Sequence, residues 1–156
     1  MSEDVRRRAA VTAIDVTAAA AHCTQFLSGS LDADWSAPVP GMAWTIAQAV
    51  AHVSEGLLMY AVDLSSGPRE ITTLDVRVKP ESSSAALIAM LVATARVVAT
   101  VIAATPPDVL GFHPWGSAGP EGYAAMSCDE MLIHTDDTLC ARVHARLLAA
   151  FFGRAV

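Results

Sequence analysis

The residues with the clearest potential for chemistry are a glutamate and a histidine four positions apart near the C-terminus. If Glu130 and His134 share a helix, their side chains stack on one face about one turn apart and can bind a single ion. His52, early in another predicted helix and one position off its apolar stripe, offers a third ligand. The spacing alone is weak, because such a pair also stabilises ordinary helix surfaces and an isolated histidine is more often a hydrogen-bonded core residue.

Two carboxylates lie close in sequence to these candidates. Asp137, three residues after His134, could orient the imidazole from behind or cap the end of the helix. Glu55 lies about one turn beyond His52 and allows the same supporting role, although a solvated surface glutamate is the more common reading of such a position. Both interpretations stay open for each residue.

The other histidines, cysteines and tryptophans have no partner at ligand spacing. The expected bystanders are His22, His113 and His144, although His113 lies in a Gly/Pro-rich loop where it could line the mouth of a pocket. Cys128 points away from Glu130 on a helical wheel, Cys23 fits an apolar stripe, and Cys140 has no neighbouring base that would activate it. The three tryptophans, Trp35, Trp44 and Trp115, are expected to plug the ends of the bundle. Trp115 could also contact a substrate.

Four helical segments must position these side chains. Apolar residues recur with helical spacing over residues 3–28, and a capping box at Thr45 and Gln48 opens a helix that should end near residues 65–68. Serines at 82–84 offer caps for a third helix ending at 104. A fourth begins near Glu121 and runs to about Asp137, after which residues 139–152 form its continuation or a short fifth helix. We expect a long crossover at 69–81, with one short extended piece.

These segments predict one all-α domain over residues 1–156, a four-helix bundle with a long connection between its second and third helices. Apolar residues make up 53% of the chain and aromatic residues only 6%, a mixture that favours helices over sheets. The segment 85–104 is apolar enough to suggest a membrane span. Arg96 at its middle would be costly in a bilayer, so we interpret it as a bundle helix.

Charge and cysteine usage exclude several classes of function. A formal net charge of −6 and a pI near 5.2 repel a phosphate backbone, and the one basic run, Arg6–Arg8, is expected to be a solvated helix face, so nucleic acid is not an expected partner. Three cysteines without metal-binding spacing argue against a disulfide framework. Because the N-terminus also lacks a signal peptide pattern, we expect a cytoplasmic protein.

Three blocks of sequence resemble one known family. Residues 34–52, DWSAPVPGMAWTIAQAVAH, are similar to the Trp/Pro/Gly loop and following helix of the DinB-like metalloprotein superfamily. Residues 112–126, FHPWGSAGPEGYAAM, resemble the loop that leads into the last bundle helix of its mycothiol-dependent maleylpyruvate isomerase N-terminal domain branch, common in actinobacteria. Residues 130–137, EMLIHTDD, resemble the E-(L/M)-L-x-H-T-x-D signature of that branch.

The resemblance implies a DinB-like bundle in which His52, Glu130 and His134 bind a divalent metal. Two imidazoles and a carboxylate suit zinc, with nickel or iron as alternatives, and three protein ligands leave a position open for water or substrate. The family further implies a low-molecular-weight thiol such as mycothiol. The expected function is therefore a metal-dependent thiol S-transferase acting on a small electrophile; the alternative is a non-catalytic metal-binding or stress-response bundle that self-associates. Either protein could be a homodimer.

Two departures from the family pattern bear on this function. The isomerases of the family carry a second, C-terminal domain that helps to form their active site, and with the sequence ending at Val156 we expect no such domain here. We therefore expect a transferase rather than an isomerase. Similar sequences also insert a glycine-containing segment after the signature, whereas only Thr138 separates Asp137 from Leu139, so the last helix is expected to be fused to the fourth or repositioned.

Overall fold

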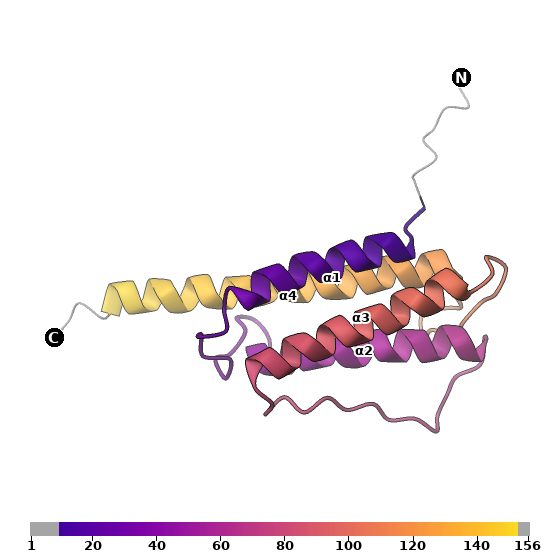
Figure 1. The fold of residues 1–156 in the computed structure, drawn as a ribbon. Helices are drawn as coiled ribbons and strands as arrows, with labels where there is room; N and C mark the ends of the chain where they lie inside the picture. Colours follow the sequence, from indigo (N-terminus) through magenta and orange to yellow (C-terminus); the bar gives the residue numbers. More distant parts are fainter. Residues whose placement is uncertain (1–9, 153–156) are drawn as a thin grey trace, which may run out of the picture.

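The computed structural model describes residues 10–152, with side chains described for residues 10–138. It is an all-α four-helix bundle, as the sequence predicted, with helices α1 (Ala13–Ser28), α2 (Ile46–Ser66), α3 (Ser84–Ala104) and α4 (Pro120–Phe152). Figure 1 shows α2 and α3 running in the same direction, with α1 and α4 antiparallel to them. The helices α1 and α2 lie on opposite sides of α3 and α4, and each packs against both.

Side-chain caps set the start of the first three helices. Thr12 and Asp15 form a capping box at α1, so this helix begins ten residues later than the predicted start near Glu3, and Arg6–Arg8 lie outside the described residues. The predicted capping box of α2 is confirmed, because the Thr45 amide donates to Gln48 Oε1 at 2.8 Å and the Gln48 amide donates to Thr45 Oγ1 at 3.2 Å. Ser83 caps α3.

The core is built mainly from aliphatic side chains of the four helices. Its largest fully buried members include Leu57 and Leu64 of α2, Leu87 and Leu91 of α3, and Met131 of α4. By length and composition α3 could cross a membrane, with a mean hydropathy of 2.2. Its buried stripe is nevertheless explained by packing against α1 and α2, which favours the bundle helix predicted from the sequence.

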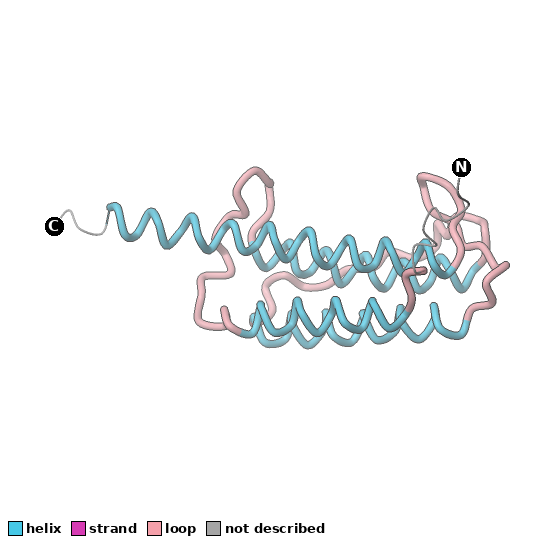
Figure 2. Tube along the Cα trace, turned by 90° about the horizontal axis from the view of Figure 1, so that it is seen from above, coloured by secondary structure: helices cyan, strands magenta, loops and turns pink. Residues whose placement is uncertain are grey.

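Two connections bear on the predictions. The crossover between α2 and α3 contains no strand; its described backbone is irregular and is held to α2 where the Val78 amide donates to Glu55 Oε1 at 2.8 Å. The predicted short extended piece thus forms no strand. At the other end, α4 runs unbroken from Pro120 to Phe152, so the fused arrangement is correct, and its C-terminal part extends beyond the other helices (Figures 1 and 2).

Candidate metal centre

The three predicted ligands meet at the seam between α2 and α4. His52 Nε2 lies 3.2 Å from Glu130 Oε1, and His134 Nε2 lies 3.5 Å from the same oxygen. One ligand atom from each residue falls within 4.8 Å of the other two. Two imidazole nitrogens and one carboxylate oxygen thus meet at a common point, although His52 precedes Glu130 by 78 positions in the sequence and His134 by 82.

A glycine on α2 provides the space for the carboxylate. Gly56 follows His52 by one turn, and a Cβ built on it would lie 3.6–3.8 Å from the carboxyl end of Glu130. Glu130 and His134 expose only 18% and 17% of their side chains, whereas His52 exposes 42%. The site is therefore enclosed on the α4 side and open to solvent beside His52.

Two buried atoms at this point lack a well-directed hydrogen-bond partner, Glu130 Oε1 and His134 Nδ1, and the first faces both imidazoles. Glu130 Oε1 is buried and accepts no well-directed hydrogen bond, although both imidazoles are close to it. An unsatisfied buried acceptor costs about 1–3 kcal/mol and a charged one more. A divalent cation between this oxygen and the two nitrogens would satisfy it, and the donor set of two imidazoles and a carboxylate is one that zinc accepts. The residues present therefore fit a metal.

The electrostatics favour an ionised carboxylate. The close contact with His134 lowers the pKa of Glu130, an effect opposed by burial and reinforced by the charges of both histidines. The same contact raises the pKa of His134. Desolvation by burial opposes this rise, and the negative charge of Asp137 adds to it. At neutral pH the centre thus presents an anionic oxygen to any cation.

Asp137 supports His134 from behind. Its Oδ2 lies 3.3 Å from His134 Nδ1, at ion-pair distance but without the alignment of a hydrogen bond, on the opposite side of the ring from the nitrogen that faces Glu130. Because α4 continues to Phe152, there is no helix end at Asp137 to cap, and the orienting interpretation is the one that agrees with the structure. Glu55 has neither of its two predicted roles, since its carboxylate accepts from the Val78 amide.

The tryptophans divide between three environments. Trp35 is buried and donates from Nε1 to the Ser30 carbonyl oxygen at 2.9 Å, as expected of a plug. Trp44 instead lies against the metal centre, with its ring centroid 4.5 Å from that of His52 and 6.0 Å from that of His134. Trp115 is 93% exposed, so the prediction that it plugs the bundle was wrong.

Tyr60 is a site residue that sequence reasoning missed. It lies two turns beyond His52 on α2, and its hydroxyl is 3.5 Å from Glu130 Oε2. Burial, together with the negative charge of Glu130, raises the pKa of Tyr60 to about 12, so the phenol is a proton donor at neutral pH. The spacing of His52, Gly56 and Tyr60 at four and four residues was the available signal, but a tyrosine in an apolar stripe is usually core.

Of the remaining candidates, those whose side chains the structure describes do not belong to the cluster of three ligands. Cys23 is buried and Cys128 half-buried; burial raises the pKa of both thiols, and neither belongs to the metal cluster. His22 is exposed, while His113 is half-buried with its ring 6.1 Å from that of Tyr60. The side chains of Cys140 and His144 lie outside the described residues.

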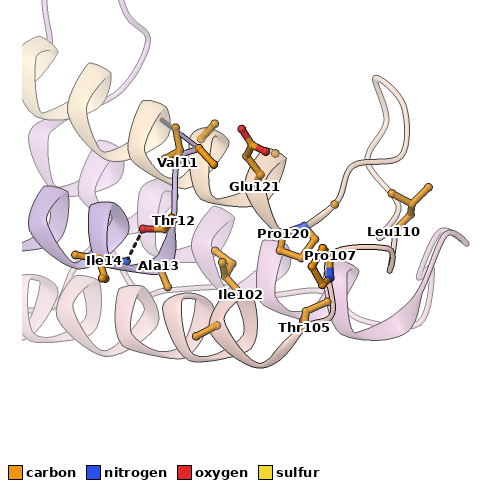
Figure 3. Close-up of a pocket in the computed structure, with 15 residues that line it drawn as sticks. Val11, Thr12, Ala13, Ile14, Ile102, Thr105, Pro107, Leu110, Pro120 and Glu121 are labelled. Carbon is orange, nitrogen blue, oxygen red and sulfur yellow. Dashed lines mark hydrogen bonds between the residues drawn. The ribbon is translucent and has the colours of Figure 1, made fainter. Parts of the chain in front are cut away.

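A large cavity lies elsewhere, where the starts of α1 and α4 meet the end of α3 (Figure 3). Its volume is about 860 Å³, and none of the three ligands lines it. Its wall is mostly apolar and includes Val11, Ile14, Ile102, Leu110 and Pro120. This cavity is therefore separate from the candidate metal centre.

A comparison with known protein families assigns the chain to one of them. The family model of the mycothiol maleylpyruvate isomerase N-terminal domain matches residues 16–138. The chain belongs to this family. The matched region contains His52, Glu130 and His134 and also Tyr60 and Asp137. No curated protein and no solved structure matches the chain.

Proposed function

We propose that this member of the mycothiol maleylpyruvate isomerase N-terminal domain family binds one divalent metal, zinc by preference, and transfers a low-molecular-weight thiol to a small electrophile. The observation that carries the proposal is the convergence of His52, Glu130 and His134 on one point, with a buried oxygen that lacks a partner. The family supports the thiol, because its description names mycothiol. Nickel or iron would suit the same ligands.

The three ligands have separate tasks in this proposal. Glu130 supplies the negative charge, and His52 and His134 supply neutral nitrogens, with Asp137 holding the second imidazole in orientation. A divalent metal held by this set would lower the pKa of a coordinated thiol, so that thiolate is available at neutral pH. Three protein ligands leave a position open for that thiol.

The exposed side of the centre is where both substrates would approach. His52 is the most accessible of the three ligands, and the indole of Trp44 lies beside it. An aromatic wall next to an open ligand position suits an electrophile with an apolar or aromatic body. The enclosed side, formed by α4, excludes water from Glu130 and strengthens its attraction for a cation.

A thiol-consumption assay tests the proposal. Zinc-loaded protein should accelerate the loss of mycothiol in the presence of an alkylating electrophile such as monochlorobimane, with many turnovers per chain. The His52→Ala variant should lose this activity, and His22→Ala, which alters an exposed histidine of α1, should keep it. Assays with glutathione and cysteine would define the thiol.

If the protein binds metal and consumes no thiol, the transferase proposal is refuted. The alternative named from the sequence, a non-catalytic metal-binding bundle that self-associates, would then become the working hypothesis. Measuring the mass of the protein in solution with and without metal would test that alternative directly.

A further inference from the structure

The two carboxylate oxygens of Glu130 face different partners. Oε1 points to the imidazoles of His52 and His134, at 3.2 and 3.5 Å, while Oε2 lies 3.5 Å from the hydroxyl of Tyr60. A carboxylate on a flexible side chain can bind a cation through one oxygen or through both. The neighbour at Oε2 therefore bears on which of these occurs.

We propose that Tyr60 is a positioning residue that donates a hydrogen bond to Glu130 Oε2 and so presents Oε1 alone to the metal. The inference rests on the metal site of the proposed function and not on the transferase activity. If Oε2 is engaged by Tyr60, the carboxylate supplies one ligand atom rather than two. The centre then keeps the open position that a thiol would require.

Packing at the far side of Tyr60 holds its ring in place. The ring meets that of Tyr123 edge to face, with centroids 5.9 Å apart and an interplanar angle of 72°, and lies 6.1 Å from that of His113. Burial holds the Tyr123 ring in place, because this residue is fully buried, while its hydroxyl donates to the Phe112 carbonyl oxygen on another segment. A restrained ring costs little further entropy when its hydroxyl makes a hydrogen bond.

The distance sets the size of the effect that Tyr60 can have. At 3.5 Å the contact is longer than the usual 2.7–2.8 Å of an O–H···O hydrogen bond. Groups that support metal ligands in this way typically change metal affinity by about 10–100-fold. For so long a contact we expect the lower end, about tenfold.

The test compares two phenylalanine variants with the wild-type protein. Tyr60→Phe removes only the hydroxyl that faces Glu130. Tyr123→Phe removes a neighbouring hydroxyl that faces a backbone carbonyl and serves as the control. For each protein, Zn²⁺ affinity is measured by competition with a chromophoric chelator, the visible absorption of bound Co²⁺ is recorded, and the unfolding midpoint is determined in urea.

The inference predicts that Tyr60→Phe binds Zn²⁺ about tenfold more weakly than the wild type and shifts the Co²⁺ absorption band. Tyr123→Phe should lower the unfolding midpoint and leave both metal readouts unchanged. Wild-type affinity and an unaltered Co²⁺ band in Tyr60→Phe would overturn the inference while leaving the metal site intact. Failure of the wild type to bind either metal would overturn the proposed function and this inference with it. If Tyr60→Phe does not fold, Tyr60→Met gives the same comparison.

Discussion

Substitution of Gly56 tests the packing that places Glu130. A Cβ at this position would lie 3.6–3.8 Å from the Glu130 carboxyl group, which is ordinary van der Waals contact. Gly56→Ala should therefore fit and should raise the free energy of unfolding by about 0.5–1 kcal/mol, because alanine is the better helix former inside α2. For a domain of this size that corresponds to a rise of about 1–4 °C in melting temperature.

A leucine at the same position should have the opposite effect. Its branches would occupy the space that Glu130 now fills, so overpacking should cost about 1–3 kcal/mol and should displace the carboxylate from the two imidazoles. Thermal unfolding followed by circular dichroism measures the first effect, and zinc content measures the second. Gly56→Ala should retain zinc, whereas Gly56→Leu should lose it.

A second glycine provides the matched control. In α4, a Cβ on Gly122 would lie 2.9 Å from Ala118 Cβ, which is too close for the neighbour to remain where it is. Gly122→Ala should therefore bring no gain in stability, although it makes the same chemical change. If Gly56→Ala lost zinc, or if both alanine variants were stabilised equally, the reasoning about the space around Glu130 would be refuted.

Three further predictions concern stability. Burial raises the pKa of Asp63, an effect that His113 opposes and Glu70 reinforces. Because a raised carboxyl pKa makes the free energy of unfolding fall as pH rises above about 4, Asp63→Asn should stabilise the protein at neutral pH. Urea titrations should show this gain shrinking as pH falls toward about 4. Thr45→Ala removes the cap of α2 and should lower the free energy of unfolding by about 1 kcal/mol in the same assay. Gly111→Ala places a Cβ 2.6 Å from Leu64 Cα and should lower the melting temperature measured by calorimetry, whereas Gly41→Ala, with open space around it, should lower it less.

Local signals predicted most of the fold. The capping box at Thr45 and Gln48 predicted the start of α2 to the residue, because the two side chains that form it lie only three positions apart in sequence. The start of α1 was misplaced because residues 3–12 continue the apolar spacing of the helix, whereas Thr12 and Asp15 form a capping box that begins it later. A cap of this kind competes with the periodic pattern and decides where the helix begins.

The sequence predicted the three side chains that converge at the candidate metal centre, but not their surroundings. Glu130 and His134 share a helix face by spacing alone, and the family resemblance supplied His52. The roles of Trp44 and Tyr60 depend on how α2 packs on α4 and on the loop before α2, which no local pattern encodes. For the same reason Glu55 was read from its distance to His52, although its partner, Val78, lies 23 residues away in the crossover.

Metal content measured by elemental analysis tests the central claim most directly. Protein purified after incubation with zinc and removal of the unbound ion should carry one zinc per chain. His52→Ala and His134→Ala should carry almost none, while His22→Ala should match the wild type. Wild-type protein without metal, or variants at His52 and His134 that keep a full equivalent, would contradict the assignment of this centre.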